Sequence, residues 1–194
     1  MSSKKGKKLI LIRNDILEEA AKITSREGKT VYAFTNEIFE QALKAYEMQT
    51  SPAELVEFFT LMKLEKDSGT TIIPVDLLDY MLTKMYNTDK EELLKKWYEA
   101  GHWWGKYLSI KSQPDDWVQT FEKLVKKCAW NITDFSVNHQ QGHTNVKCVA
   151  PHFALESTEA LTKFFEGVMH SAGYKTVKNE CLKGIILLTL KKPD

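Results

Sequence analysis

Two histidines in the C-terminal half are separated by the spacing of a zinc site. His139 and His143 lie four positions apart, and on a helix they would share one face. However, residues 140–142 are Gln-Gln-Gly, which is typical of a hairpin turn, and the glutamate of a His-Glu-x-x-His motif is absent. We therefore interpret both histidines as residues that flank a turn, and we expect no metal site.

Other catalytic motifs are missing from the sequence. It contains no glycine-rich phosphate loop, no Gly-x-Ser-x-Gly elbow and no recognisable pair of carboxylates. Cys128, Cys148 and Cys181 are widely separated, so we predict reduced, buried thiols in a cytoplasmic protein. We therefore expect that the protein is not an enzyme and that it has no catalytic residues and no cofactor.

Aromatic side chains are dense between residues 97 and 130. Most of them are expected in a core, because aromatic rings supply much of the buried area, and some could line an apolar cavity for a small molecule. A solid core without a cavity is the alternative. The candidate pocket residues are Trp97, Trp104, Tyr107, Phe164 and Val168.

Charge is distributed unevenly along the 194 residues. The formal net charge is +1, but residues 1–13 carry five basic side chains and no acidic one, and the rest sums to −4. Such an asymmetry is typical of contact with nucleic acid or another anionic surface. The apolar run Leu9–Ile12 is too short for a signal peptide, and no stretch approaches the ~18 apolar residues of a membrane span. We expect a cytoplasmic protein with no membrane contact.

Residues 1–50 are predicted to form a first domain of one strand and two helices. A unit this small buries little core by itself, so we expect it to dimerise by pairing its strand with that of a second copy. The expected elements are a strand at 7–13, a helix at 15–27 capped by Asn14 and ended by Gly28, and a helix at 31–48 capped by Thr30.

Residues 51–194 are predicted to form a helical connector followed by an α+β domain. The last ~80 residues repeat one unit twice, a helix followed by an antiparallel hairpin. The predicted fold class is therefore α+β, with a four-stranded antiparallel sheet covered by helices. Gly101 and Gly105 indicate that their helix packs closely against a neighbour. The expected helices lie at 52–66, 74–86, about 90–108, 114–128 and 157–172, and the strands at 131–139, 143–150, 174–180 and 184–191.

Four segments of the first domain form a pattern: Lys8-Leu-Ile-Leu-Ile-Arg13, Asp15-Ile-Leu-Glu-Glu-Ala-Ala21, Arg26-Glu-Gly-Lys-Thr30 and Asn36-Glu-Ile-Phe-Glu-Gln-Ala-Leu43. Residues 7–50 thereby resemble the ribbon-helix-helix family of DNA-binding proteins. The resemblance implies a homodimer whose paired strands enter the major groove, while the second helix points its first amides at a phosphate. Because the strand is aliphatic here, we expect phosphate contacts more than base reading. The implied DNA-binding residues are Lys4, Lys5, Lys7, Lys8, Ile10, Ile12, Arg13, Lys29 and Thr30.

Three later segments form a second pattern: Trp97-Tyr-Glu-Ala-Gly-His-Trp-Trp-Gly-Lys-Tyr-Leu108, Phe164-Phe-Glu-Gly-Val-Met-His-Ser-Ala-Gly-Tyr174 and Glu180-Cys-Leu-Lys-Gly184. Residues 90–194 thereby resemble the 4-vinyl-reductase-type ligand-binding domain, which is akin to subunits of the TRAPP vesicle-tethering complex and to haem-NO-binding domains. The resemblance implies a pocket for a small apolar molecule that regulates an attached module. Residues 185–188 are aliphatic where family members carry a further cysteine, so no cysteine-based zinc site is expected.

Together these features predict a homodimeric transcription regulator. Its partners would be double-stranded DNA, a second copy of the chain and a small apolar ligand, which the C-terminal domain would sense unless that domain serves assembly. Two alternatives stay open. The chain could be an interaction or scaffold protein that only dimerises through residues 1–50, or a haem, metal or small-molecule-binding enzyme that uses the C-terminal pocket.

Overall fold

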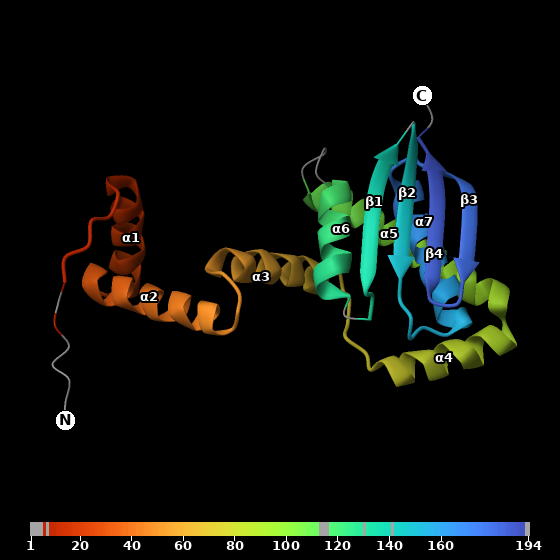
Figure 1. The fold of residues 1–194 in the computed structure, drawn as a ribbon, viewed down its shortest axis with the longest axis horizontal. Coiled ribbons are helices and arrows are strands. Elements are labelled where there is room, and N and C mark those ends of the chain that lie inside the picture. The colour runs from red at the N-terminus through yellow and green to blue at the C-terminus, as the bar shows by residue number, and fades with distance from the viewer. Residues whose placement is uncertain (1–5, 7, 113–116, 130, 141, 193–194) are drawn as a thin grey trace. The chain divides into compact units, whose positions relative to one another are not determined.

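The computed structural model describes residues 6, 8–112, 117–129, 131–140 and 142–192 (Figure 1). The chain divides into two compact units, Met1–Glu57 and Phe58–Asp194. The division falls inside helix α3 (Pro52–Asp67), later than the boundary after residue 50 that we expected from the sequence.

The first unit contains helices α1 (Asn14–Glu27) and α2 (Val31–Glu47), followed by the beginning of α3. Two predicted helix signals are confirmed. Gly28 adopts a left-handed backbone conformation, with φ of 66°, and ends α1. The side chain of Thr30 accepts a hydrogen bond of 3.1 Å from the backbone N–H of Ala33 and caps α2.

Two other expectations for this unit are not met. The predicted cap at Asn14 was wrong, because α1 begins at Asn14 itself and Arg13 precedes it without a capping side-chain hydrogen bond. No strand is present among residues 8–13 of the single chain. A strand needs a hydrogen-bonded neighbour, so the strand stays a prediction that depends on a second copy.

The second unit is an α+β domain with the predicted four-stranded antiparallel sheet. Its strands lie in the order β1-β2-β4-β3, and each hairpin follows a helix, which confirms the repeated helix–hairpin pattern. The helix predicted to start at Ser157 begins earlier, at Leu155. Beyond α3 the elements are α4 (Val75–Thr88), α5 (Lys90–Lys111), α6 (Trp117–Cys128), β1 (Asp134–Gln140), β2 (His143–Val149), α7 (Leu155–Ser171), β3 (Lys175–Leu182) and β4 (Ile185–Lys191).

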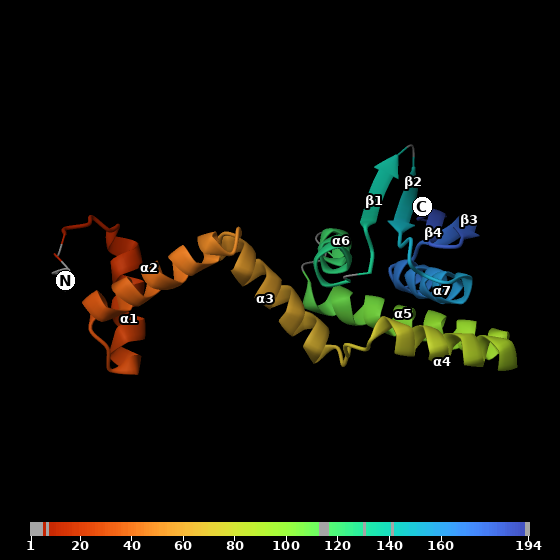
Figure 2. The ribbon, with the colours of Figure 1, turned by 60° about the horizontal axis from the view of Figure 1, so that its bottom comes forward.

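The core of this unit lies against one face of the sheet. Alternate residues of β1, β2 and β4 point to that face, as the period of a strand requires. Figure 2 shows α7 between the sheet and α5, with α4 beside α5. The buried strand residues form rows across the sheet, Phe135 with Cys148 and Ile186, and Val137 with Val146 and Leu188.

None of the helices in the described ranges is both long and apolar enough to cross a membrane.

Helices α5 and α7 approach each other at three glycines. A Cβ atom added to Gly101 would lie 2.1 Å from the carbonyl oxygen of Phe164, and one on Gly167 would lie 2.2 Å from that of Tyr98. A Cβ atom on Gly105 would lie 2.3 Å from the side-chain oxygen of Ser171 and 2.8 Å from the carbonyl oxygen of Val168. The predicted close packing at Gly101 and Gly105 is confirmed, because only a residue without a side chain fits between these two backbones.

Candidate functional site

The first unit leaves most of its apolar side chains uncovered. Among its described residues only Thr24 and Ala45 are buried, so the apolar side chains of α1 and α2 build no core within a single chain. The exposed large apolar side chains of the N-terminal segment, α1 and α2 are Leu9, Ile10, Leu11, Ile12, Ile16, Leu17, Tyr32, Ile38, Phe39, Leu43, Tyr46 and Met48.

Some of the predicted phosphate-binding residues already have carboxylate partners. Lys4, Lys5 and Lys7 lie outside the described residues. The guanidinium of Arg13 donates hydrogen bonds of 3.1 and 2.7 Å to the carboxylate of Asp15, and these bonds lower the pKa of that carboxyl group. Both side chains are exposed, and an exposed ion pair contributes little, so Arg13 can exchange Asp15 for a phosphate.

The remaining polar candidates lie at or near the surface. Lys8 is exposed. The ammonium of Lys29 lies 2.9 Å from the carboxylate of Glu37 and 3.1 Å from that of Glu27, and these contacts raise the pKa of Lys29. Thr30 uses its hydroxyl as the cap of α2. Residues 14–57 carry four basic and nine acidic side chains, so within the first unit only the N-terminal segment has a net positive charge.

The two aliphatic residues predicted to contact DNA, Ile10 and Ile12, are less exposed than the leucines that alternate with them. Ile10 and Ile12 are 58% and 37% exposed, whereas Leu9 and Leu11 are 91% and 92% exposed. The alternation is that of an extended chain with one partly covered side, which is the geometry a strand of a second copy would need. The DNA contact predicted for Ile10 and Ile12 stays a prediction.

Four of the five candidate pocket residues lie together in the second unit. The ring centre of Phe164 lies 6.4 Å from that of Trp97 and 5.9 Å from that of Trp104. Val168, one turn further along α7, is completely buried in the same core cluster as Trp104. The structure therefore brings these side chains together at the α5–α7 interface, where Phe164 lies against both tryptophans.

Tyr107, the fifth candidate, has a separate environment. Its ring stacks on Trp103, with ring centres 5.5 Å apart and planes inclined by 9°. The ammonium of Lys111 lies 5.8 Å from the centre of the same ring. The hydroxyl of Tyr107 is buried and has no hydrogen-bond partner among the residues that the structure describes.

A ladder of polar contacts joins α7 to the second hairpin, and the sequence analysis did not identify it. Four polar residues of α7 follow one another at intervals of four, which places them on one face of the helix. This four-residue spacing is the signal in the sequence from which a polar face on the helix could have been predicted. The contacts are Thr158 with the N–H of Gly184 (2.9 Å), Thr162 with Cys181 (3.4 Å), Glu166 with Asn179 (3.2 Å) and His170 with Thr176 (2.8 Å).

His170 closes this polar ladder at the end of α7. Its Nδ1 lies 3.1 Å from the hydroxyl of Tyr98, and its Nε2 accepts a bond of 3.3 Å from the backbone N–H of Thr176. Burial lowers the pKa of His170. The end of a helix favours a cation, but here the loss of hydration opposes that preference and the net effect is a lowered pKa.

The remaining candidates for chemistry have structural partners. His139 and His143 flank the β1–β2 turn, and Nδ1 of His139 lies 2.8 Å from the hydroxyl of Thr144. Burial raises the pKa of the Cys148 thiol to about 12, which suppresses the reactive thiolate. Within the described ranges, no three histidine, cysteine or acidic side chains are grouped so that they could hold a metal ion.

Comparison with known proteins gives weak similarity to solved structures. No protein-family model and no curated protein matches the chain. A structure solved to probe the function of heme distortion in the H-NOX family is 12% identical, has a TM-score of 0.42, and aligns over 73% of this chain and 88% of its own. A structure on the mechanism of H-NOX activation is 11% identical, with a TM-score of 0.40 over 71% and 86%. At such values no residue role or ligand is transferred to this chain.

Proposed function

We propose that the chain is a homodimeric DNA-binding regulator, whose first unit dimerises and holds DNA and whose second unit senses a small apolar ligand or mediates assembly. The uncovered apolar surface of the first unit carries this proposal. A unit with only two buried residues in its described part cannot stabilise its helices alone, because helices this short draw their stability from packing. The exposed side chains lie on all three of its segments, as an intertwined pair of identical chains requires.

The N-terminal segment supplies the DNA contact in this proposal. Two copies of residues 8–13 would pair as antiparallel strands, and this pairing would bring together the two copies of residues 1–13, which carry ten basic side chains, five from each copy. Phosphate contacts are then the main source of affinity, and they position the protein without reading sequence.

The acidic surface of α1 and α2 favours a second candidate function. Nine acidic residues against four basic ones in 14–57 would repel DNA that approaches these helices. A homodimer that serves only as an interaction or scaffold module would also leave Arg13 and Lys29 in their present ion pairs.

A salt titration onto duplex DNA separates the two functions. We expect binding whose log K falls by about 0.9 per neutralised phosphate for each tenfold rise in salt, which is about 0.5 per phosphate between about 50 and 200 mM. Replacement of Lys4, Lys5, Lys7 and Lys8 by Gln is expected to abolish most of that slope. The matched control replaces four exposed lysines of α5, Lys95, Lys96, Lys106 and Lys111, and is expected to bind like the wild type. A dimer that does not bind DNA even at low salt would refute the regulator and favour the scaffold.

A further inference from the structure

Helix α4 carries apolar side chains on two opposite faces. Its inner face packs on α5 and α7 through Leu78, Leu82 and Tyr86. A surface helix ordinarily keeps its outer face polar, so a second apolar face indicates a second partner. The outer face carries Leu77, Tyr80, Met81 and Met85, which are 48, 62, 43 and 50% exposed.

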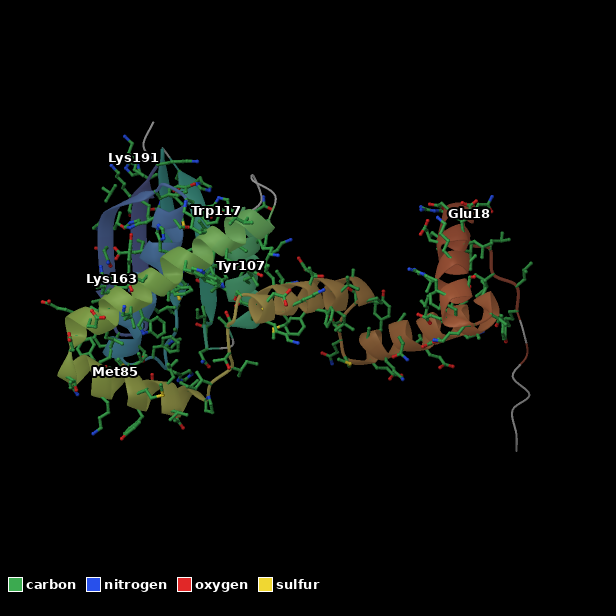
Figure 3. All side chains as sticks on the ribbon, turned by 180° about the vertical axis from the view of Figure 1, so that it is seen from behind. Glu18, Met85, Tyr107, Trp117, Lys163 and Lys191 are labelled. Carbon is green, nitrogen blue, oxygen red and sulfur yellow. The ribbon has the colours of Figure 1, made fainter. Side chains whose placement is uncertain are left out.

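Hydrogen bonds fix the rotation of α4 about its axis. The hydroxyl of Ser157 donates to the carboxylate of Asp79, and the hydroxyl of Tyr86 donates to that of Glu159 over 3.0 Å. These bonds and the packing of Leu82 hold the inner face against the rest of the second unit. Figure 3 shows side chains of α4 projecting away from that unit. The outer apolar face therefore cannot turn inward, and it is open to a partner from outside this unit.

The charges of the outer face indicate the partner and its direction. Asp76 lies near the beginning of the face and Lys84 near its end, with the Lys84 ammonium 5.9 Å from the ring centre of Tyr80. In a parallel pair of α4 helices, like charges would be opposite each other. In an antiparallel pair with its two-fold axis between Tyr80 and Met81, Asp76 of each copy lies beside Lys84 of the other, and the apolar side chains meet between them.

We propose that the outer face of α4 binds the same face of α4 in a second copy, in antiparallel orientation. The inference rests on the proposed homodimer for its tether. One helix pair buries less surface than a free dimer needs, but dimerisation through the first unit would hold two second units at an effective concentration in the millimolar range.

Disulfide cross-linking of the full chain tests this geometry. Met81→Cys lies beside the axis, so its two copies are expected to cross-link under mild oxidation. In this antiparallel pair, position 77 of one copy lies about 10 Å along the helix from position 77 of the other, and the same holds for position 84, so neither Leu77→Cys nor Lys84→Cys can form a disulfide with itself. Position 77 of one copy lies beside position 84 of the other, so the two variants are expected to cross-link with each other when mixed. Ile110→Cys, at an 80% exposed position of α5, is the matched control.

The expected rates give clear outcomes. In the same tethered dimer, Met81→Cys is expected to cross-link about tenfold faster than Ile110→Cys or more, because the α4 contact holds only the first pair of thiols within reach of a disulfide. Adding Asp76→Lys is expected to slow that reaction about fivefold, and adding Lys84→Asp as well to restore it. Equal rates for Met81→Cys and Ile110→Cys, in a chain that sediments as a dimer, would overturn the α4 contact and leave the proposed homodimer intact. A monomeric chain without the cross-link would overturn both.

Discussion

At the scale of single residues, His170 shows how burial sets the charge of a side chain. Burial lowers its pKa from the ordinary value of 6.5, and Glu166 opposes this shift while Lys163 and His102 add to it. The unfolded chain therefore binds a proton at this residue more readily than the folded chain does. Above pH 6.5 the titration of His170 does not reduce the stability of the fold. As the pH falls from 6.5 toward the lowered pKa, this titration reduces the stability progressively.

We expect His170→Gln to weaken this pH dependence. Urea unfolding of the wild type between about pH 5 and 7.5 should show a stability that decreases below pH 6.5, and the variant should lose less of it because the half-buried imidazole is absent. The control is His152→Gln, which replaces an exposed histidine in the loop after β2. A variant with the same pH slope as the wild type would show that His170 does not set it.

At the scale of elements, the α5–α7 interface depends on backbones that touch. An added Cβ at Gly167 would lie 2.2 Å from the carbonyl oxygen of Tyr98 and 2.7 Å from the backbone nitrogen of His102. Backbone atoms cannot rotate away as the end of a side chain can, so the helices have to separate. That movement would also disturb the aromatic contacts that Phe164 makes with Trp97 and Trp104.

We expect Gly167→Ala to destabilise the second unit by about 3 kcal/mol or more, which lowers its melting temperature by about 10 °C. Thermal unfolding followed by tryptophan fluorescence measures this change. Gly6→Ala is the control, because nothing lies within 4 Å of its added methyl group. If Gly167→Ala melts like the wild type, the two helices do not pack as closely as the structure shows.

At the scale of the whole molecule, the two units differ in how they are stabilised. The second unit has its own buried core, whereas the described part of the first unit buries only Thr24 and Ala45. A unit whose core forms only on association is stabilised by mass action, so its melting temperature rises with protein concentration. We therefore expect the units to unfold separately.

The distribution of tryptophan allows this prediction to be measured. All five tryptophans lie in the second unit, so their fluorescence reports that unit alone, whereas far-UV circular dichroism reports the helices of both. We expect circular dichroism to show an additional transition at lower temperature that shifts upward when the chain is concentrated about tenfold. Superimposed curves from both signals at every concentration would contradict this expectation.

The sequence alone determined the parts of the fold that depend on local physics. The hairpins follow from alternation, the end of α1 from Gly28, the cap of α2 from Thr30, and the close helix contact from Gly101 and Gly105. Each of these signals acts between residues that are neighbours in the chain or that share one face of an element, so the pattern is visible without the fold.

The tertiary structure decided what depends on residues that are distant in sequence. The ladder between α7 and the second hairpin, the lowered pKa of His170 and the second apolar face of α4 arise only when separate elements meet. The spacing of Thr162, Glu166 and His170 in the sequence is enough to put them on one face of a helix. That this face lies opposite the polar side chains of β3 is visible only in the folded chain. Burial and hydrogen bonding are properties of the packed chain, because desolvation depends on every neighbour and not on the residue type.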